Sequence, residues 1–437
     1  MDPQLIGWLS LALMLVLLGL GIPIYIVLSA LGFIGYWLIE GQARAFAVVA
    51  LIPYSRLAIY TFSVIPLFIF MGNMVFAAGF GRDLYAACRL WFGRLPGGLA
   101  QGTLGACVLF GAVCGSSIAS AATFTRIAVP EMLRYGYSPK LATACVAAGG
   151  TISQMIPPSI IMVIYGLITQ QSIGKLLIAG IIPGFIAAIN FMIVVYIWAK
   201  LYPQDAPPFK EPWSWRGNLV AVKGLWGVVM IAAIVIGGIY TGVFTPTEAG
   251  ALGAFVALFV AISARRFSWG PFGQALRGSA ETTIMIHVIL LGAFIYSNFL
   301  AITQIPQDIA GFLLGLQVPP IAVLIGIMVM YIVLGCFMDI LSALFLTLPI
   351  IFPAILALGF DPIWFGVLVV HIVEIAMVTP PFGVNLFVVK GAAGDDVELS
   401  EIIRGICPFV AADTITLAIF IAFPELILFL PNLMLGK

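Results

Sequence analysis

Hydrophobic residues recur along the chain in runs long enough to cross a lipid bilayer, from Leu5 to Leu435. A helix of roughly 20 apolar residues spans the hydrocarbon core of a membrane. Polar residues separate these runs at short intervals, and the longest polar stretch, residues 200–223, is too short to form a domain. The pattern predicts an all-α polytopic membrane protein with almost no mass outside the membrane.

Two of the apolar runs contain a pair of adjacent prolines. These are "MIPPSIIM" at 155–162 and "VTPPFGVN" at 378–385. Proline removes a backbone hydrogen bond and kinks or breaks a helix. A simple proline kink is the alternative at each place. Because the pair recurs, we predict two broken transmembrane helices, at about 141–172 and about 363–392.

The two proline pairs belong to an internal repeat with an offset of 223 residues. At this offset Pro130 matches Pro353, and "YGYSP" at 135–139 matches "LGFDP" at 358–362. Repeats of this kind indicate two related structural units. The predicted organisation is a first repeat, a cytoplasmic linker and a second repeat, each repeat with a re-entrant helical hairpin: 1–200 with a hairpin at about 97–128, 201–223, and 224–437 with a hairpin at about 320–353.

Lysine and arginine residues predict how the chain is oriented. If each half contributes three helices, a hairpin, a broken helix and a last helix, then 15 of the 19 basic residues fall on one side. The positive-inside rule makes that side cytoplasmic and places both termini outside. The two halves then have opposite topology. Inverted repeats with discontinuous helices are typical of secondary transporters.

Composition narrows the possible functions. The chain is 62% hydrophobic and 8% charged, with a mean hydropathy of +1.17 and a net charge of +1. These values argue against a water-soluble domain and against a nucleic-acid surface. The six cysteines have no CxxC spacing, and there is no GxxxxGK phosphate loop. Energy for transport must therefore come from an ion gradient or from a partner.

Two hydroxyl-rich segments are candidates for ion chemistry. "GAVCGSSIASAATFTR" at 111–126 offers small residues and hydroxyl oxygens, which suit Na⁺. "GCFMDILSALFLTLPI" at 335–350 adds the carboxylate of Asp339, and a carboxylate within the membrane commonly marks an ion or proton site. Two alternatives remain open. The first segment can be a small-residue helix interface, and Asp339 can cap a helix at the aqueous mouth.

Taken together, these segments resemble the large membrane subunit of TRAP (tripartite ATP-independent periplasmic) transporters. The resemblance covers essentially the whole chain. Its most specific motifs are "FTPTEA" at 244–249, "IPPSI" at 156–160 and "PPFGVNL" at 380–386. One departure is Ile118, where many relatives carry a proline after the paired serines.

The resemblance implies an elevator-type, Na⁺-driven importer of a small organic anion in the bacterial inner membrane, with periplasmic termini. It implies two partners, a small four-helix membrane subunit and a periplasmic substrate-binding protein, and no organic cofactor. By position, it assigns one Na⁺ site to Ser116, Ser117, Gly149, Gly150, Thr151 and Pro157. It assigns a second to Asp339, Ser342, Thr379, Pro380 and Gly383, and the substrate carboxylate to Ser120, Thr123, Ser159 and Asn385.

Three other functions remain as alternatives. A standalone Na⁺/carboxylate symporter of the same fold would need no binding protein. A passive channel would ignore the Na⁺ gradient. A membrane-embedded enzyme would want a cluster of catalytic or metal-binding side chains, and the chain has only two histidines, far apart in sequence. We therefore expect a transporter without enzymatic activity.

Overall fold

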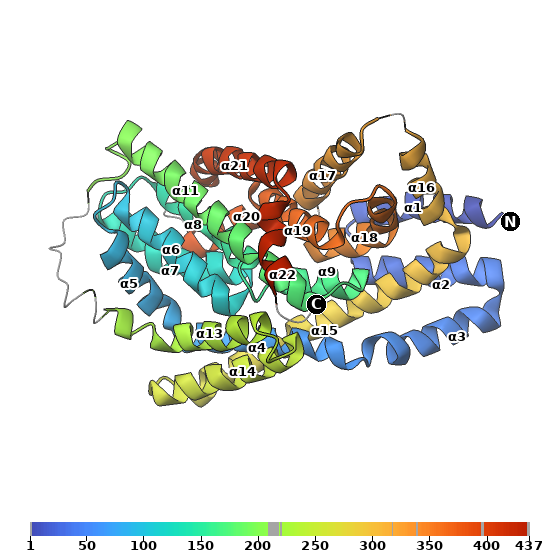
Figure 1. Ribbon diagram of the computed structural model, residues 1–437, viewed down its shortest axis with the longest axis horizontal. Helices are drawn as coiled ribbons and strands as arrows, with labels where there is room; N and C mark the ends of the chain where they lie inside the picture. The colour runs from blue at the N-terminus through green and yellow to red at the C-terminus, as the bar shows by residue number, and fades with distance from the viewer. Residues whose placement is uncertain are drawn as a thin grey trace.

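A computed structural model shows the protein as an assembly of helices (Figure 1). The described residues contain no β-strand. They are residues 2–208, 218, 221–316, 318–337, 340–394 and 397–434.

The first half of the chain begins with helices at the right of Figure 1 and ends with α11 at its left. A π-helical turn at Pro53–Leu57 and a 3₁₀ turn at Tyr60–Ser63 separate α3 from α4. The helices are α1 (Pro3–Gly19), α2 (Ile24–Glu40), α3 (Gln42–Ile52), α4 (Val64–Ala77), α5 (Phe80–Phe92), α6 (Gly98–Cys114), α7 (Ser117–Arg134), α8 (Pro139–Met155), α9 (Ile160–Thr169), α10 (Ile173–Ala179) and α11 (Ile181–Leu201).

The second half follows a similar order of elements. As in the first half, an interrupted helix follows a pair of consecutive helices. The helices are α13 (Trp226–Tyr240), α14 (Pro246–Ser263), α15 (Trp269–Thr303), α16 (Ile305–Gly315), α17 (Pro320–Phe337), α18 (Ile340–Ala357), α19 (Pro362–Val378), α20 (Val384–Ala393), α21 (Leu399–Ala422) and α22 (Glu425–Leu433).

The helices have the length and composition of membrane spans. Within the described part of the chain, six are long and apolar enough to cross a bilayer, or up to seven if the bent pair α8 and α9 counts as one span. Several shorter apolar helices accompany them. Together with the absence of strands in the described residues, this agrees with the predicted all-α polytopic class.

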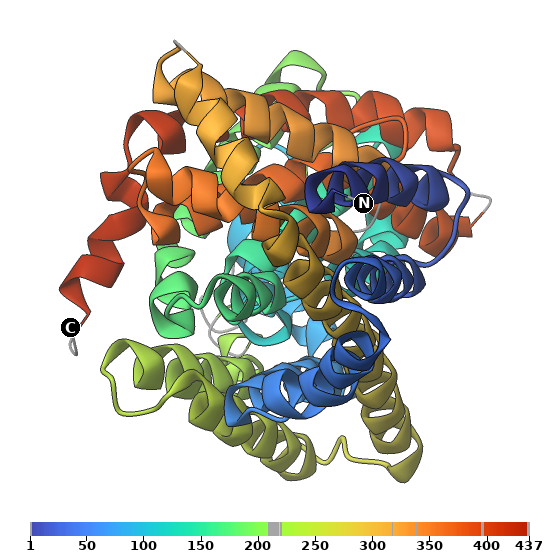
Figure 2. The same ribbon diagram turned by 90° about the vertical axis from the view of Figure 1, so that its right-hand side faces the viewer.

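The helices form two packed groups. In the outer group, α15 packs against α2 and α4, and α14 packs against α4 and α13. Figure 2 shows the blue N-terminal helices beside α15 at one end of the molecule. In the other group, which we call the bundle, α8 contacts α6, α7, α19 and α21. The interrupted helices therefore lie inside the bundle.

The two most enclosed helices are the first halves of the interrupted ones. Every residue of α8 from Leu141 and every residue of α19 from Ile363 is buried. Both are rich in apolar or small residues on all sides, as in a core helix or a membrane span, and here other helices surround them. Close packing supports this arrangement, since a Cβ on Gly405 of α21 would lie 2.3 Å from the carbonyl oxygen of Lys140. The interruptions are thus placed at the centre of the bundle.

Candidate functional site

The connection between α6 and α7 is short and tightly folded. Gly115 ends α6 with φ +59°, a backbone conformation that favours glycine. Ser116 precedes α7 in an extended conformation, and its hydroxyl accepts a hydrogen bond from the amide of Ala119 at 3.3 Å. A serine cap of this kind fixes where a helix begins. The paired serines therefore mark the tip of the α6–α7 hairpin and the start of α7.

The first interruption separates α8 from α9 at residues 156–159 and contains Pro157 and Pro158. The two helices are bent by 43° at this point. Ser159 caps α9, with its hydroxyl accepting from the amide of Met162 at 3.3 Å. A Cβ on Gly115 would lie only 1.8 Å from the carbonyl oxygen of Pro158. The hairpin tip therefore rests directly on the first break.

The second interruption separates α19 from α20 at residues 379–383 and contains Pro380 and Pro381. Thr379 is extended, and its hydroxyl donates to the carbonyl oxygen of Ile375 at 2.6 Å. Gly383 precedes α20 and offers no side-chain cap. Asn385, fully buried in the first turn of α20, donates to the Ser117 hydroxyl at 2.6 Å. This hydrogen bond joins the second break to the first hairpin.

Residues of both hairpins, and residues that flank both breaks, line one cavity of about 880 Å³. Parts of α1, α2 and α15 close its other side. Four helices begin at its wall, and their first residues are among those lining it: Ser117 of α7, Ile160 of α9, Ile340 of α18 and Val384 of α20. Each helix start carries a partial positive charge and unpaired backbone N–H groups. The cavity is therefore suited to hold an anion.

No charged side chain is among the described residues that line this cavity. Its polar side-chain groups are the hydroxyls of Ser116, Ser117, Ser342, Thr282 and Tyr25 and the amide of Gln154. Most of the wall is apolar, which strengthens any electrostatic interaction inside it. Helix dipoles and neutral oxygen or nitrogen groups therefore set the electrostatics of the site.

Gln154 is a functional candidate that the sequence prediction missed. It lies in the last turn of α8, is 4% exposed and lines the cavity. Its Nε2 is buried and makes no hydrogen bond to any residue that the structure describes. Buried amides are nearly always satisfied by partners, so this group is available to a ligand. The signal in the sequence was a glutamine in an otherwise apolar or small-residue segment, three residues before the proline pair.

The cavity contains three of the predicted ion-site residues, Ser116, Ser117 and Ser342. Four others pack behind the first hairpin or in the first break. Gly149 contacts α6 near Cys107, and Gly150 faces α7, where an added Cβ would lie 3.1 Å from the Ser117 carbonyl oxygen. Thr151 donates to the carbonyl oxygen of Ala148 within α8, and Pro157 lies in the break.

The predicted residues of the second ion site are less well assembled. Asp339 lies outside the described residues. Thr379, Pro380 and Gly383 form the second break but do not line the cavity, whereas Met377 and Val384 on either side of them do. Among the described residues, no cluster of three or more histidine, cysteine or acidic side chains could hold a metal ion. Any cation here would be held by hydroxyl, amide and carbonyl oxygens, which suit hard cations.

The structure separates the predicted substrate residues. Asn385 adjoins the hairpin tip and has an unpartnered buried Oδ1. The Ser120 hydroxyl is engaged between α7 and α8 by the Ser153 hydroxyl at 2.7 Å, and Ser159 is used as a helix cap. Thr123 lines another cavity, of about 760 Å³, together with Arg82 and Arg126. None of the four is among the residues that line the 880 Å³ cavity, and the side chain of Asn385 reaches it through the hydroxyl of Ser117.

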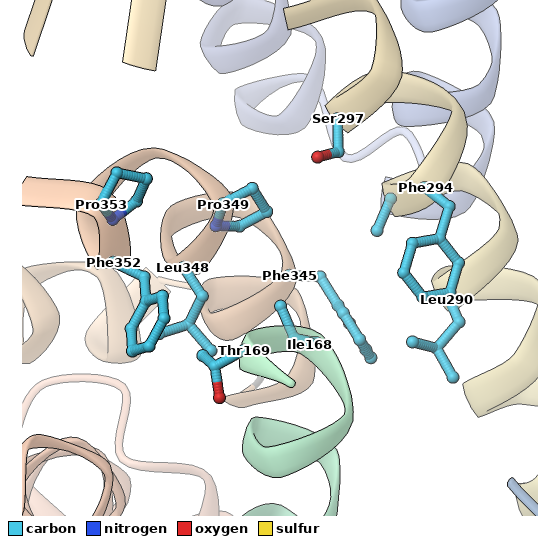
Figure 3. Close-up of a pocket in the computed structure, with 11 residues that line it drawn as sticks. Ile168, Thr169, Leu290, Phe294, Ser297, Phe345, Leu348, Pro349, Phe352 and Pro353 are labelled. Carbon is cyan, nitrogen blue, oxygen red and sulfur yellow. The ribbon is translucent and has the colours of Figure 1, made fainter. Parts of the chain in front are cut away.

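A third cavity, of about 240 Å³, lies where α9 and α18 of the bundle face α15 (Figure 3). It is lined mainly by apolar side chains, including Phe294, Phe345 and Phe352, with the hydroxyls of Thr169 and Ser297 as its polar groups. It contains none of the predicted site residues. Its position marks an apolar boundary between the bundle and the outer group.

These features define an α-helical membrane transporter as the class of protein. The fold is similar to that of the Alcanivorax borkumensis YdaH transporter, with a TM-score of 0.65 over 97% of this chain and 98% of that one. The two sequences are only 12% identical, so this likeness concerns the fold alone.

The chain belongs to the DctM component of the tripartite ATP-independent periplasmic transporters, whose family model matches residues 11–426. It is 36% identical to the C4-dicarboxylate TRAP transporter large permease protein DctM of Pseudomonas aeruginosa, over 85% of this chain and 86% of that protein. It is also 35% identical to the isethionate TRAP transporter permease protein DctMQ of Oleidesulfovibrio alaskensis, over 92% of this chain and 62% of that protein.

Family membership confirms several of the predictions. The protein is the large membrane subunit of a TRAP transporter, a multi-pass inner membrane protein, and a secondary transporter without enzymatic activity. This family works with a small membrane subunit and a periplasmic binding protein. The orientation of the termini, the Na⁺ dependence and the individual ligand residues stay predictions.

Proposed function

We propose that the protein imports a small organic anion together with Na⁺, after a periplasmic binding protein has delivered the substrate. The observation that carries this proposal is the convergence of four helix starts on one cavity without charged lining residues among those described. A carboxylate or similar anion is favoured there by the helix dipoles, and bound Na⁺ would add the positive charge that the side chains do not supply.

The first Na⁺ site is proposed around Ser117. Its hydroxyl accepts from Asn385, its carbonyl oxygen lies against Gly150, and the carbonyl oxygen of Pro158 lies against the same hairpin tip. The unpartnered Oδ1 of Asn385 supplies a further buried acceptor. Main-chain carbonyl oxygens of broken helices coordinate Na⁺ in secondary transporters, and hydroxyl and amide oxygens are hard ligands that suit the same ion. A second site would use Ser342 with the main chain of residues 379–383.

The proposed motion is an elevator movement of the bundle against the outer group. Both hairpins and both interrupted helices would move together with the cavity, and α2, α4, α14 and α15 would stay in place with the small subunit. The apolar cavity between α15 and the bundle supports this division, because it leaves few polar bonds to break at that boundary. With periplasmic termini, each net positive charge carried inward would gain ~2.3 kcal/mol per 100 mV of membrane potential.

The relatives suggest the first substrates to try. One is named for C4-dicarboxylates and another for isethionate, and both are small anions. The cognate binding protein should first be screened against such compounds by thermal shift. The large and small subunits are then reconstituted into liposomes, and uptake of the selected compound is measured with the binding protein outside. Uptake is expected with an inward Na⁺ gradient and lost when choline replaces Na⁺.

Variants tie this experiment to the site. Ser117→Ala should weaken the dependence of uptake on Na⁺ concentration, whereas Ser55→Ala, at an exposed serine outside the bundle, should leave it unchanged. Flux that ignores the Na⁺ gradient would favour a passive channel. Uptake by the membrane subunits alone would favour a standalone symporter of the same fold.

A further inference from the structure

Three ionisable side chains meet in the interior of the bundle, away from the residues assigned above. His371 and Glu374 lie on α19 and Asp413 lies on α21, and each is at most 2% exposed. The Nε2 atom of His371 is 3.3 Å from Oδ1 of Asp413. Glu374 follows His371 by three residues, so both lie on one side of α19. The carboxyl of Asp413 lies within electrostatic range of the Glu374 carboxyl. We call these three residues the buried triad.

The buried triad contains polar atoms without hydrogen bonds. They are Nδ1 of His371, Oε1 of Glu374 and Oδ1 of Asp413. Among the described residues, these side chains make one hydrogen bond, from Nε2 of His371 to the main-chain carbonyl oxygen of Asp413 at 3.4 Å. Unsatisfied buried groups are rare and require an explanation such as a functional role. Carboxyl and imidazole groups both bind protons. A carboxyl that has bound a proton gains an O–H group that can donate a hydrogen bond.

The surroundings offer no counter-charge for two buried carboxylates. None of the other titratable groups on the helices packed against α19 and α21 forms a hydrogen bond or ion pair with the triad, within the described part of the chain. Two buried carboxylates with a single imidazole beside them are strongly unfavourable in a membrane interior, which favours the binding of a proton. The other titratable groups on these neighbouring helices or at their ends are Lys140, Cys145, Tyr165, Lys175, Tyr196, Lys200, Tyr331, Cys336, Asp361, Lys390, Glu401, Arg404, Cys407 and Glu425.

The triad is close to the cavity along α19. Met377 lines the cavity and lies three residues beyond Glu374, about one helical turn away. The second break begins two residues later, at Thr379. Proton exchange between the triad and cavity water would therefore need to cross only one turn of a helix that ends at this break.

We propose that His371, Glu374 and Asp413 form a proton-binding site, which takes a proton from cavity water and returns it there. Glu374 is the carrier, because its Oε1 has no partner, whereas His371 and Asp413 are in contact with each other. A hydronium ion in the cavity gives its proton to the Glu374 carboxylate and leaves a neutral water molecule, and release reverses this step. The inference does not rest on Na⁺ coupling.

Infrared difference spectroscopy tests the site in the purified complex of the large and small subunits. Spectra are compared between acidic and alkaline buffers with choline chloride as the only salt. The wild type should show the C=O band of a protonated, buried carboxyl that disappears at alkaline pH. Glu374→Gln should lack this band, since glutamine copies the shape of a protonated glutamate without its titration. Glu425→Gln, at an exposed carboxyl on α22, should keep it.

A second variant, Asp413→Asn, keeps the test decisive if Glu374→Gln does not fold. Asp413→Asn should keep the band but move the midpoint of its titration by about tenfold in proton concentration, because it alters the charge beside Glu374. The proposal is overturned if the wild type shows no titrating band, if the band survives in Glu374→Gln, or if Asp413→Asn leaves the midpoint in place. Because Na⁺ is absent throughout, a failure of the proposed Na⁺ coupling would not change these results.

Discussion

The two interrupted helices differ in how their breaks are completed. Residues 156–159 of the first break are buried, and Ser159 satisfies the start of α9 with its own hydroxyl. In the second break Pro381 and Phe382 are exposed, and Gly383 leaves α20 without a side-chain cap. The first break is therefore buried and capped by the protein's own side chains. The second break leaves the start of α20 without a side-chain cap, the role that a ligand would fill.

The hydrogen bond between Asn385 and Ser117 makes the two breaks dependent on each other. Ser117 belongs to the hairpin that covers the first break, and Asn385 belongs to the helix that follows the second. A ligand that orders one break must therefore affect the other. This coupling would let one bound ion prepare the site for the next ligand, as expected when ligands share a preorganised site.

The largest effect is expected from Gly115→Ala, which attacks the contact that closes the first break. The added Cβ would lie 1.8 Å from the carbonyl oxygen of Pro158. It would also force alanine into φ +59°. Overpacking costs about 1–3 kcal/mol, and a left-handed backbone adds about 1–2 kcal/mol. The midpoint temperature of thermal unfolding of the purified subunit complex should fall markedly, and uptake in proteoliposomes should be abolished.

Gly359→Ala is the matched control for this prediction. Gly359 has φ +81°, and a Cβ there would meet nothing within 4 Å. This variant should carry the backbone cost alone, about 1–2 kcal/mol, and should still transport. If Gly115→Ala transports as well as Gly359→Ala does, the hairpin tip does not rest on the first break in the working protein.

A double-mutant cycle measures the dependence between the two breaks. Ser117→Ala, Asn385→Ala and the double variant are compared for unfolding and for the Na⁺ concentration that gives half-maximal uptake. The hydrogen bond is buried and 2.6 Å long, so a coupling of about 0.5–3 kcal/mol is expected in both measurements. Additive effects on Na⁺ dependence would mean that the breaks act separately.

The pair Asn73 and Ser279 provides the control cycle. It has the same chemistry, with an asparagine amide donating to a serine hydroxyl at 2.8 Å, but it joins α4 to α15 in the outer group. The control cycle should give a similar coupling energy in the free energy of unfolding. It should give no coupling in the Na⁺ concentration for half-maximal uptake. The comparison therefore separates loss of stability from loss of communication between ligand sites.

The sequence was sufficient to predict the helical class and the positions of the interruptions. Long apolar runs determine the former, and adjacent prolines determine the latter regardless of tertiary packing. The contact of Asn385 with Ser117 was beyond reach, because the two residues are separated by 268 positions in the chain. Its detection requires knowing how α7 and α20 pack.

The predicted substrate residues show why side-chain placement is harder. The family resemblance places Thr123 with the substrate carboxylate between the hairpin tips. It lies six residues beyond Ser117 on a continuous helix, about 9 Å along the axis, and lines a different cavity. Gln154, in contrast, was missing from the predicted site residues. A buried glutamine usually has a partner, and only the packing around α8 shows that this one has none.

Gln154 tests whether the first break contributes to substrate binding as well as to structure. Gln154→Leu should change the free energy of unfolding by less than about 1.5 kcal/mol, since volume is kept and no hydrogen bond is lost. It should raise the KM for an anionic substrate about tenfold, as expected for the loss of one hydrogen bond to a charged group. Gln154→Glu should raise the KM further, because it places a carboxylate in the cavity.

Gln101→Leu is the contrasting variant. The Gln101 amide is buried but donates to the carbonyl oxygen of Met192 at 2.8 Å. Its replacement should lower the free energy of unfolding by about 1–3 kcal/mol and leave the KM unchanged. An unchanged KM in Gln154→Leu would show that the region of the first break does not bind the substrate. Substrate binding would then fall to the second break.

The smallest effect is expected at Ser159, where the two breaks differ most directly. If its hydroxyl acts as a helix cap, Ser159→Ala should lower the free energy of unfolding by about 1 kcal/mol and Ser159→Gly by only a few tenths. If it binds substrate, both variants should raise the KM equally, because both lack the hydroxyl. Unfolding and uptake measured on the same preparations decide between these patterns. The first pattern would show that α9 is capped by the protein itself, which leaves the uncapped start of α20 at the second break as the place where a ligand completes the structure.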